Sequence, residues 1–199
     1  NAVTLLARLD VEAVDWVGIS LGGLMGMALG AFERSPIRRL LISDAGPILA
    51  RTAIERIASY VGVSPAFPTR AAAFAAIRTI SEPFGPHTDA QWDFLIDNVL
   101  VRRDDGTYVL HYDPALGVPF RAALAVPGDV DLWGLWDAVR APTMVIRGER
   151  SDLVTAETAD AMSRRGPRAE VVTLPGVGHA PTLVPDEQIA LVRAFLERP

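Results

Sequence analysis

The stretch VDWVGISLGGLMG places one hydroxyl, that of Ser20, where an apolar run gives way to a glycine-rich one. Gly18 lies two residues before this serine and Gly22 two residues after it, which makes a G-x-S-x-G pattern. The pattern is typical of a sharp strand-to-helix turn that strains the serine backbone and raises its Oγ above the sheet. We expect both glycines to be required there, because the two positions crowd each other. The stretch therefore predicts a nucleophile at Ser20.

A serine hydroxyl is a weak nucleophile unless a base takes its proton and a third group holds that base in the right tautomer. On a parallel sheet these partners are expected in the chain order serine, acid, histidine, each in a loop that follows a strand. His179 lies in LPGVGHAP, directly after the apolar run EVVTL, and is the predicted general base. Asp152 lies in RGERSDLV, directly after TMVI, and is the predicted orienting acid.

Two other carboxylates are alternatives for the acid. Asp44 also ends an apolar run, in LLISDAGP, and some serine hydrolases carry their acid one strand earlier. Glu149 is a weaker rival, three residues before Asp152. We prefer Asp152 for its place relative to His179, although a turn or helix-start role is the ordinary one for an aspartate there.

The predicted chemistry is acyl transfer to water. Ser20 attacks a carbonyl carbon, His179 moves the proton, and Asp152 stabilises the imidazolium that forms. The backbone N–H of Leu21, at the positive end of the new helix, is the expected donor to the oxyanion. This chemistry requires no metal and no organic cofactor.

Apolar runs and helical patterns alternate along most of the chain. The runs at 11–20, 38–47, 143–152 and 169–179 are expected to be strands, the first of them buried on both faces. Helical patterns follow at 21–35, 155–165 and 186–199. Short buried strands that alternate with helices predict an α/β fold with a parallel sheet covered by helices.

A long segment interrupts this alternation. It carries helical patterns at 50–61, 69–80 and 89–100, with a hairpin pattern at 99–112 around Asp-Asp-Gly. We therefore divide the chain into a first core part at 1–46 with the serine turn, a mostly helical insertion at 47–140, and a second core part at 141–199.

Composition excludes several kinds of partner. The formal net charge is −5 and all 19 basic residues are arginine, which gives no basic footprint for nucleic acid or an anionic membrane. The chain has no cysteine, so disulfides and thiolate metal ligands are excluded. Its 3 histidines lack metal-ligand spacing, and no apolar run is long enough for a membrane span. We expect a cytoplasmic protein that acts on a small molecule, and the sequence leaves open assembly as a homo-oligomer.

Three motifs, VGISLGG, RGERSD and GVGHAP, resemble the nucleophile, acid and histidine motifs of the α/β-hydrolase superfamily. LLISDAGP and the insertion are similar to those of capped bacterial members with esterase-like activity. The resemblance implies a mostly parallel sheet with helices on both faces and a helical cap inserted between two strands. It also implies further strands before Asn1, one of whose loops supplies the second oxyanion donor, so the N-terminal part of the fold is expected to be absent from this chain.

The resemblance narrows the reaction but not the substrate. A serine at the turn disfavours dehalogenase and epoxide-hydrolase chemistry, for which the family uses a carboxylate. Ester-type hydrolysis through an acyl-enzyme is the preferred function, with perhydrolase or carbon–carbon bond hydrolysis as alternatives on the same residues. A slow-turnover or non-catalytic binding protein or receptor is the alternative from another class. Six aromatic residues are pocket candidates that equally suit a cap core, and they imply a small, partly apolar substrate: Phe67, Phe84, Trp92, Phe94, Trp133 and Trp136.

Overall fold

The computed structural model describes residues 2–125 and 127–198, and the chain divides into two compact units. The core unit is Asn1–Leu49 together with Asp131–Pro199, and the inserted unit is Ala50–Val130. The inserted unit thus ends at Val130, whereas the sequence pattern placed its end at residue 140. The difference arises because the next helix, α7 (Trp133–Ala138), belongs to the core: Trp136 is fully buried and its Nε1 donates to the Arg165 carbonyl at 3.0 Å.

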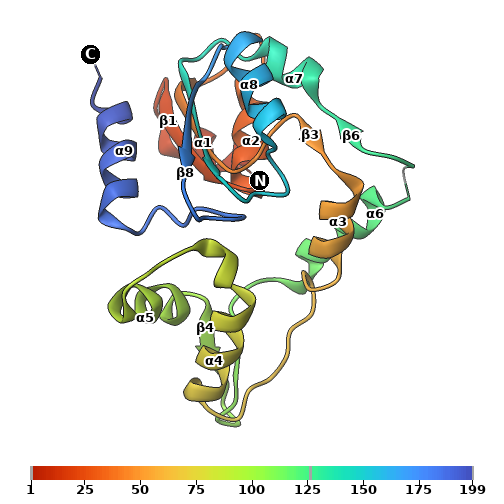
Figure 1. Cartoon of the computed structure of the whole chain (residues 1–199), viewed down its shortest axis with the longest axis vertical. Coiled ribbons are helices and arrows are strands. Elements are labelled where there is room, and N and C mark those ends of the chain that lie inside the picture. Colours follow the sequence, from red (N-terminus) through yellow and green to blue (C-terminus); the bar gives the residue numbers. More distant parts are fainter. Residues whose placement is uncertain (1, 126, 199) are drawn as a thin grey trace. The chain divides into compact units, whose positions relative to one another are not determined.

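A parallel sheet forms the centre of the core unit, with strand order β1-β2-β7-β8 (Figure 1). The four strands are β1 (Val14–Ile19), β2 (Ile37–Ser43), β7 (Thr143–Gly148) and β8 (Glu170–Leu174). All six residues of β7 are buried, as expected for a central strand covered on both faces. The chain leaves and re-enters this unit through two-residue strands, β3 (Ile48–Leu49) and β6 (Val130–Asp131).

Helices cover both faces of the sheet. Leu40 of β2 faces α2 (Leu21–Gly30). A Cβ added to Gly26 of this helix would lie 2.8 Å from Cδ1 of Leu40. Leu41 instead packs in a cluster with Phe195 of α9 (Asp186–Leu196). Successive residues of a strand point to opposite faces, so α2 and α9 lie on opposite sides of the sheet, as Figure 1 also shows. The predicted α/β fold with a mostly parallel, helix-flanked sheet is confirmed.

The edge strand β1 corrects one expectation. Val17 is 40% exposed and Ile19 is 38% exposed, so β1 is not buried on both faces as its apolar sequence predicted. Within the described residues β1 pairs only with β2, which leaves its other side uncovered there.

The glycines of α2 let the helix approach the sheet closely. A Cβ on Gly26 would lie 2.5 Å from Cδ1 of Trp16, and one on Gly23 would lie 2.7 Å from Cγ2 of Ile42. Gly22 differs, because an added Cβ would meet nothing within 4 Å among the described residues. The sequence predicted that both positions require glycine. This is confirmed for Gly18, which lies against the backbone of Gly22, and is wrong for Gly22, which has room for a side chain.

Two more helices complete the core unit, α1 (Ala2–Leu9) and α8 (Ala156–Arg164). Thr155 caps α8, since its side chain accepts a hydrogen bond from the Thr158 N–H at 3.1 Å. Among the described residues, no helix is both long and apolar enough to cross a bilayer.

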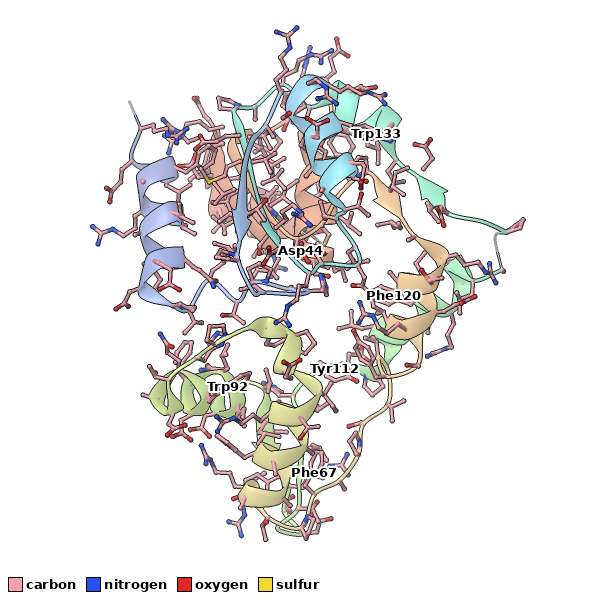
Figure 2. All side chains as sticks on the ribbon, viewed as in Figure 1. Asp44, Phe67, Trp92, Tyr112, Phe120 and Trp133 are labelled. Atoms are coloured by element: carbon pink, nitrogen blue, oxygen red, sulfur yellow. The ribbon has the colours of Figure 1, made fainter. Side chains whose placement is uncertain are left out.

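The inserted unit is mostly helical, with one hairpin. Its antiparallel strands pair on either side of an Asp-Asp-Gly turn in which Gly106 has φ 85°, as the sequence predicted. Trp92 is only 5% exposed and lies against the His87 ring at 4.9 Å, so it packs inside this unit (Figure 2). The elements are α3 (Arg51–Ala58), α4 (Arg70–Ile80), η1 (Glu82–Phe84), α5 (Asp89–Asp97), β4 (Leu100–Arg102), β5 (Tyr108–Leu110), η2 (Pro114–Leu116) and α6 (Gly117–Ala123).

Candidate active site

Strands β1 and β2 end level with one another, and a polar residue comes directly after each of them. Ile19 of β1 pairs in register with Ser43 of β2, which in turn pairs with Ile146 of β7. The next residues along the first two strands are Ser20 and Asp44. Both therefore lie at the carboxyl edge of a parallel sheet, where ligands of such folds bind.

Ser20 occupies a strained turn between β1 and α2. Its φ of 49° and ψ of −114° lie in a region that residues with a side chain rarely adopt. Its N–H donates to the Ser43 carbonyl at 2.8 Å, and its carbonyl accepts from Gly23 N–H at 2.9 Å. A Cβ on Gly18 would lie 2.3 Å from the carbonyl carbon of Gly22, so only glycine fits before this turn. The local sequence thus builds the predicted strand–turn–helix geometry.

His179 reaches Ser20 from the loop after β8. Its Nε2 lies 3.0 Å from the Ser20 Oγ, and its side chain is 11% exposed. The loop crosses directly over the end of β7, since a Cβ on Gly148 would lie 2.1 Å from the Gly178 carbonyl oxygen. Beyond the histidine, the Ser43 hydroxyl donates to the Pro181 carbonyl at 3.0 Å. These contacts carry the imidazole across β7 to the end of β2.

Asp44 is the carboxylate that meets this imidazole. Its Oδ2 lies 2.7 Å from the His179 Nδ1, and the aspartate side chain is fully buried. Figure 2 shows Asp44 among the strands of the core unit. Its backbone is also unusual, with φ 51°. Two further groups approach the carboxylate: the Ser151 hydroxyl lies 2.7 Å from Oδ2, and the Gly148 N–H lies 3.3 Å from Oδ1.

The hydrogen-bond partners assign the tautomer of His179. An ionised carboxylate only accepts, so Nδ1 carries the proton that is donated to Asp44. The other ring nitrogen, Nε2, then has a free lone pair directed at the Ser20 hydroxyl. This arrangement is chemically able to draw a proton from Ser20 and to stabilise the resulting imidazolium.

The expected partnership of Asp152 with His179 is corrected by this geometry. Asp152 is exposed, whereas its neighbour Ser151 is buried and points at Asp44. The reason is the turn after β7: the Ser151 Oγ accepts from the N–H groups of Leu153 and Val154, which directs Ser151 inward and the next side chain outward. Glu149 is also turned elsewhere, since its Oε2 accepts from Gly176 N–H at 2.8 Å. The structure thus brings Ser20 and His179 together with Asp44.

Leu21 begins α2, and the first N–H groups of a helix have no acceptor within the helix. Its N–H therefore remains the expected oxyanion donor. His87 and His111 both lie in the inserted unit. Among the residues that the structure describes, no group of three or more histidine, aspartate or glutamate side chains could hold a metal ion.

Comparison with known proteins identifies the family. The profile of the alpha/beta hydrolase family matches residues 1–191. The chain belongs to this family. Ser20, His179 and Asp44 thus lie at the sheet edge of an alpha/beta hydrolase.

Relatives of this alpha/beta hydrolase include one named as a hydrolase and one named as an esterase. It is 46% identical over 201 residues to a 3-hydroxybutyrate-oligomer hydrolase from Cupriavidus necator, covering 98% of the chain and 69% of that protein. It is 28% identical over 198 residues to a pimeloyl-[acyl-carrier protein] methyl ester esterase from Xanthomonas campestris, covering 96% of the chain and 72% of that protein. These relatives support ester hydrolysis in general terms.

A solved structure extends the likeness to the fold. An alpha/beta hydrolase from Novosphingobium aromaticivorans superposes with a TM-score of 0.84 at 38% identity, covering 98% of the chain and 69% of that protein. The chain therefore spans roughly two thirds to three quarters of the length of the relatives it matches.

Proposed function

We propose that this alpha/beta hydrolase cleaves carboxylic esters through an acyl-enzyme on Ser20, with His179 as general base and Asp44 as the orienting acid. The observation that carries the proposal is the continuous hydrogen-bond chain: Ser20 Oγ to His179 Nε2 at 3.0 Å, and Nδ1 to Asp44 Oδ2 at 2.7 Å. The strained serine backbone and the full burial of Asp44 support the same roles.

In the first half-reaction, Ser20 Oγ forms a bond to the ester carbonyl carbon as its proton passes to His179 Nε2. The carbonyl oxygen becomes an oxyanion, to which the Leu21 N–H donates. The imidazolium, stabilised by Asp44, then gives the proton to the leaving alkoxide as the ester C–O bond breaks. An alcohol leaves and the acyl group stays on Ser20.

In the second half-reaction, water takes the place of the alcohol. His179 Nε2 accepts a proton from water as the hydroxide oxygen bonds to the acyl carbon. The tetrahedral species collapses, the Ser20 Oγ leaves, and the proton returns to it from the imidazolium. The products are a carboxylic acid and free Ser20.

The proposed substrate class is a small, partly apolar ester, and short 3-hydroxyacid oligomers are the first candidates. The support is the 46% identity to a 3-hydroxybutyrate-oligomer hydrolase over nearly the whole chain. We propose that the inserted unit serves as the cap of the fold, since the chain enters it after β2 and leaves it before β7.

The test compares Ser20→Ala with Ser163→Ala in the purified protein. Ser163 is a matched serine in α8 whose hydroxyl donates to the Asp160 carbonyl at 2.7 Å, away from the site residues. We expect Ser20→Ala to lower kcat on p-nitrophenyl butyrate and on a 3-hydroxybutyrate dimer by about 10⁴-fold or more. Ser163→Ala should leave kcat within about twofold. A fluorophosphonate should add to Ser20, as located by peptide mass spectrometry. Turnover that survives Ser20→Ala unchanged would refute the mechanism, and labelling of Ser20 without ester turnover would favour a binding protein.

A further inference from the structure

The loop after β7 carries a buried hydroxyl that touches the Asp44 carboxylate. Ser151 is 9% exposed, and its Oγ lies 2.7 Å from Asp44 Oδ2, the same oxygen that meets His179 Nδ1. One carboxylate oxygen is therefore shared by a hydroxyl and an imidazole, each at 2.7 Å. The mechanism derived above uses the imidazole and gives the hydroxyl no role.

The contacts of Ser151 fix where its single proton points. A serine hydroxyl has one proton to donate and two lone pairs to accept with. The N–H groups of Leu153 and Val154 each lie 3.1 Å from Oγ and occupy those lone pairs. The proton is left for Asp44 Oδ2, so the Ser151 hydroxyl has one available orientation, that of a donor to the carboxylate.

The loop that carries Ser151 is itself held from both ends. The buried Arg147 guanidinium donates from Nε to the Val154 carbonyl at 2.9 Å and from Nη2 to the Glu149 carbonyl at 3.1 Å. The Arg150 N–H donates to the Val177 carbonyl at 2.8 Å, which joins this loop to the one that carries the histidine. The hydroxyl is therefore presented to Asp44 from a fixed backbone.

We propose that Ser151 is a positioning residue that acts through Asp44: its O–H holds the carboxylate in the plane that faces His179. This inference rests on the proposed function. Besides His179, two groups donate to the carboxylate: the Gly148 N–H to Oδ1 at 3.3 Å and the Ser151 hydroxyl to Oδ2 at 2.7 Å. The Ser151 hydrogen bond is the shorter of these two. Without it, the longer contact from Gly148 N–H remains, so the carboxylate is held less firmly beside Nδ1 and His179 loses part of its orientation.

The main test combines Ser151→Ala with Asp44→Asn in a double-mutant cycle. We expect Ser151→Ala alone to lower kcat by about 10- to 100-fold, which is the rate factor equivalent to losing one hydrogen bond to a charged group. KM should change by less than about twofold. In the Asp44→Asn background the same substitution should cause little further loss, because residues that act as a unit are strongly non-additive. The measurements are kcat and KM on p-nitrophenyl butyrate and the rate of fluorophosphonate labelling of Ser20.

Thr155→Ala is the matched control. Thr155 makes the same type of contact, accepting a backbone N–H at 3.1 Å at the start of α8, and it is exposed. Its loss should lower Tm by a few degrees and leave kcat near the wild-type value. If Ser151→Ala does not fold, Ser151→Cys keeps the shape with a weaker donor, and its kcat should fall severalfold at nearly unchanged Tm.

Each remaining outcome overturns the inference. An unchanged kcat in Ser151→Ala, or in a folded Ser151→Cys if the alanine variant fails, would show that the donor is not needed. An equal loss in the Asp44→Asn and wild-type backgrounds, or an equal loss from Thr155→Ala, would show a purely structural role. Failure of the proposed function is distinguished by Ser20→Ala: full activity of that variant would remove both proposals, whereas its inactivity with no effect at Ser151 would remove this one alone.

Discussion

Asp44 Oδ2 and His179 Nδ1 lie 2.7 Å apart although the two residues are separated by 135 positions in the chain. The contact joins the end of β2 to the loop after β8 and passes over β7, the strand between them. Because β2 also neighbours β1, the carboxylate and Ser20 follow adjacent strands. The end of β7 supplies hydrogen-bond donors to that carboxylate, from Gly148 N–H and from Ser151, in place of a carboxylate of its own.

Asp44→Asn is predicted to remove most of the activity while the protein stays folded. The groups around the carboxylate are all donors: His179 Nδ1–H, the Ser151 hydroxyl and the Gly148 N–H. If the amide NH₂ faces His179 and Ser151, the chain breaks or the imidazole takes the wrong tautomer; if it faces Gly148, it opposes that N–H. In either orientation the negative charge that stabilises the imidazolium is lost. We expect kcat to fall by about 10⁴-fold, the size of the effect when the acid of such a triad is made neutral. Steady-state kinetics on p-nitrophenyl butyrate measures it.

Asp152→Asn is the matched control for that variant. Asp152 is exposed, and its neighbour Ser151 occupies the position that faces Asp44. We expect kcat within about twofold of wild type, because the carboxylate that meets His179 is that of Asp44. The opposite result, loss of activity in Asp152→Asn with an active Asp44→Asn, would return the acid to the position that the sequence alone favoured.

The sequence paired Ser20 with His179, as the structure does, but preferred Asp152 where the structure has Asp44 as the partner of the imidazole. Ser20 and His179 each follow an apolar run and have glycines around them, so local pattern was sufficient. Asp44 and Asp152 satisfy the same rule equally well, because each follows a strand of the same sheet. What separates them is the path of the 175–179 loop over Gly148 and the inward turn of Ser151, both of which depend on long-range backbone contacts. Ser151 itself had one sequence signal, a hydroxyl beside the carboxylate in RGERSD.

The fold was more predictable than the site because its signals are periodic. Apolar runs indicated the strands of the core sheet, and the Asp-Asp-Gly turn was visible as local chemistry. The sequence pattern placed the end of the insertion at residue 140 and so included α7 in it. This helix is short, and it belongs to the core because Trp136 is buried there, which a local pattern does not reveal. The exposure of Val17 and Ile19 was also unpredictable, because an apolar strand has the same sequence at the centre of a sheet and at its edge.

Gly18→Ala is predicted to disrupt the turn at Ser20. The added Cβ would lie 2.3 Å from both the carbonyl carbon and the oxygen of Gly22, and backbone atoms yield far less readily than a flexible side chain. We expect a large loss of Tm together with loss of fluorophosphonate labelling. Gly134→Ala in α7 is the control, since a Cβ there meets nothing within 4 Å of the described residues; its stability should stay equal or rise by up to about 1 kcal/mol. A Gly18→Ala protein with wild-type Tm and labelling would contradict the close approach.

Asp15 of β1 is predicted to contribute stability that is lost in acid. The hydrogen bond from Arg38, with Nε donating to Oδ1 at 2.9 Å, is the main cause that holds the pKa of Asp15 below its usual value, and partial burial opposes it. Since the pKa is lower in the folded state, the unfolded chain binds more protons near its own pKa of about 3.9. The stabilisation is therefore complete above that value and is lost as pH falls through the lower, folded pKa.

Asp15→Asn should consequently lower Tm at pH 7 by about 2 °C, corresponding to about 0.5–1 kcal/mol for an ion pair whose Arg38 side chain is 61% exposed. The difference from wild type should shrink steadily once the pH drops below about 4, because wild-type Asp15 then becomes protonated as well. Arg38→Gln provides the control: in that background Asp15→Asn should have a smaller effect at every pH, and the remainder is due to the 3.9 Å ion pair between Asp15 and Arg39. The measurement is the Tm of the wild type, the two single variants and the double variant, followed by circular dichroism from about pH 3 to about pH 7. A Tm difference that persists undiminished at the acid end would show that Asp15 stabilises β1 through a contact other than its ionised pair with Arg38.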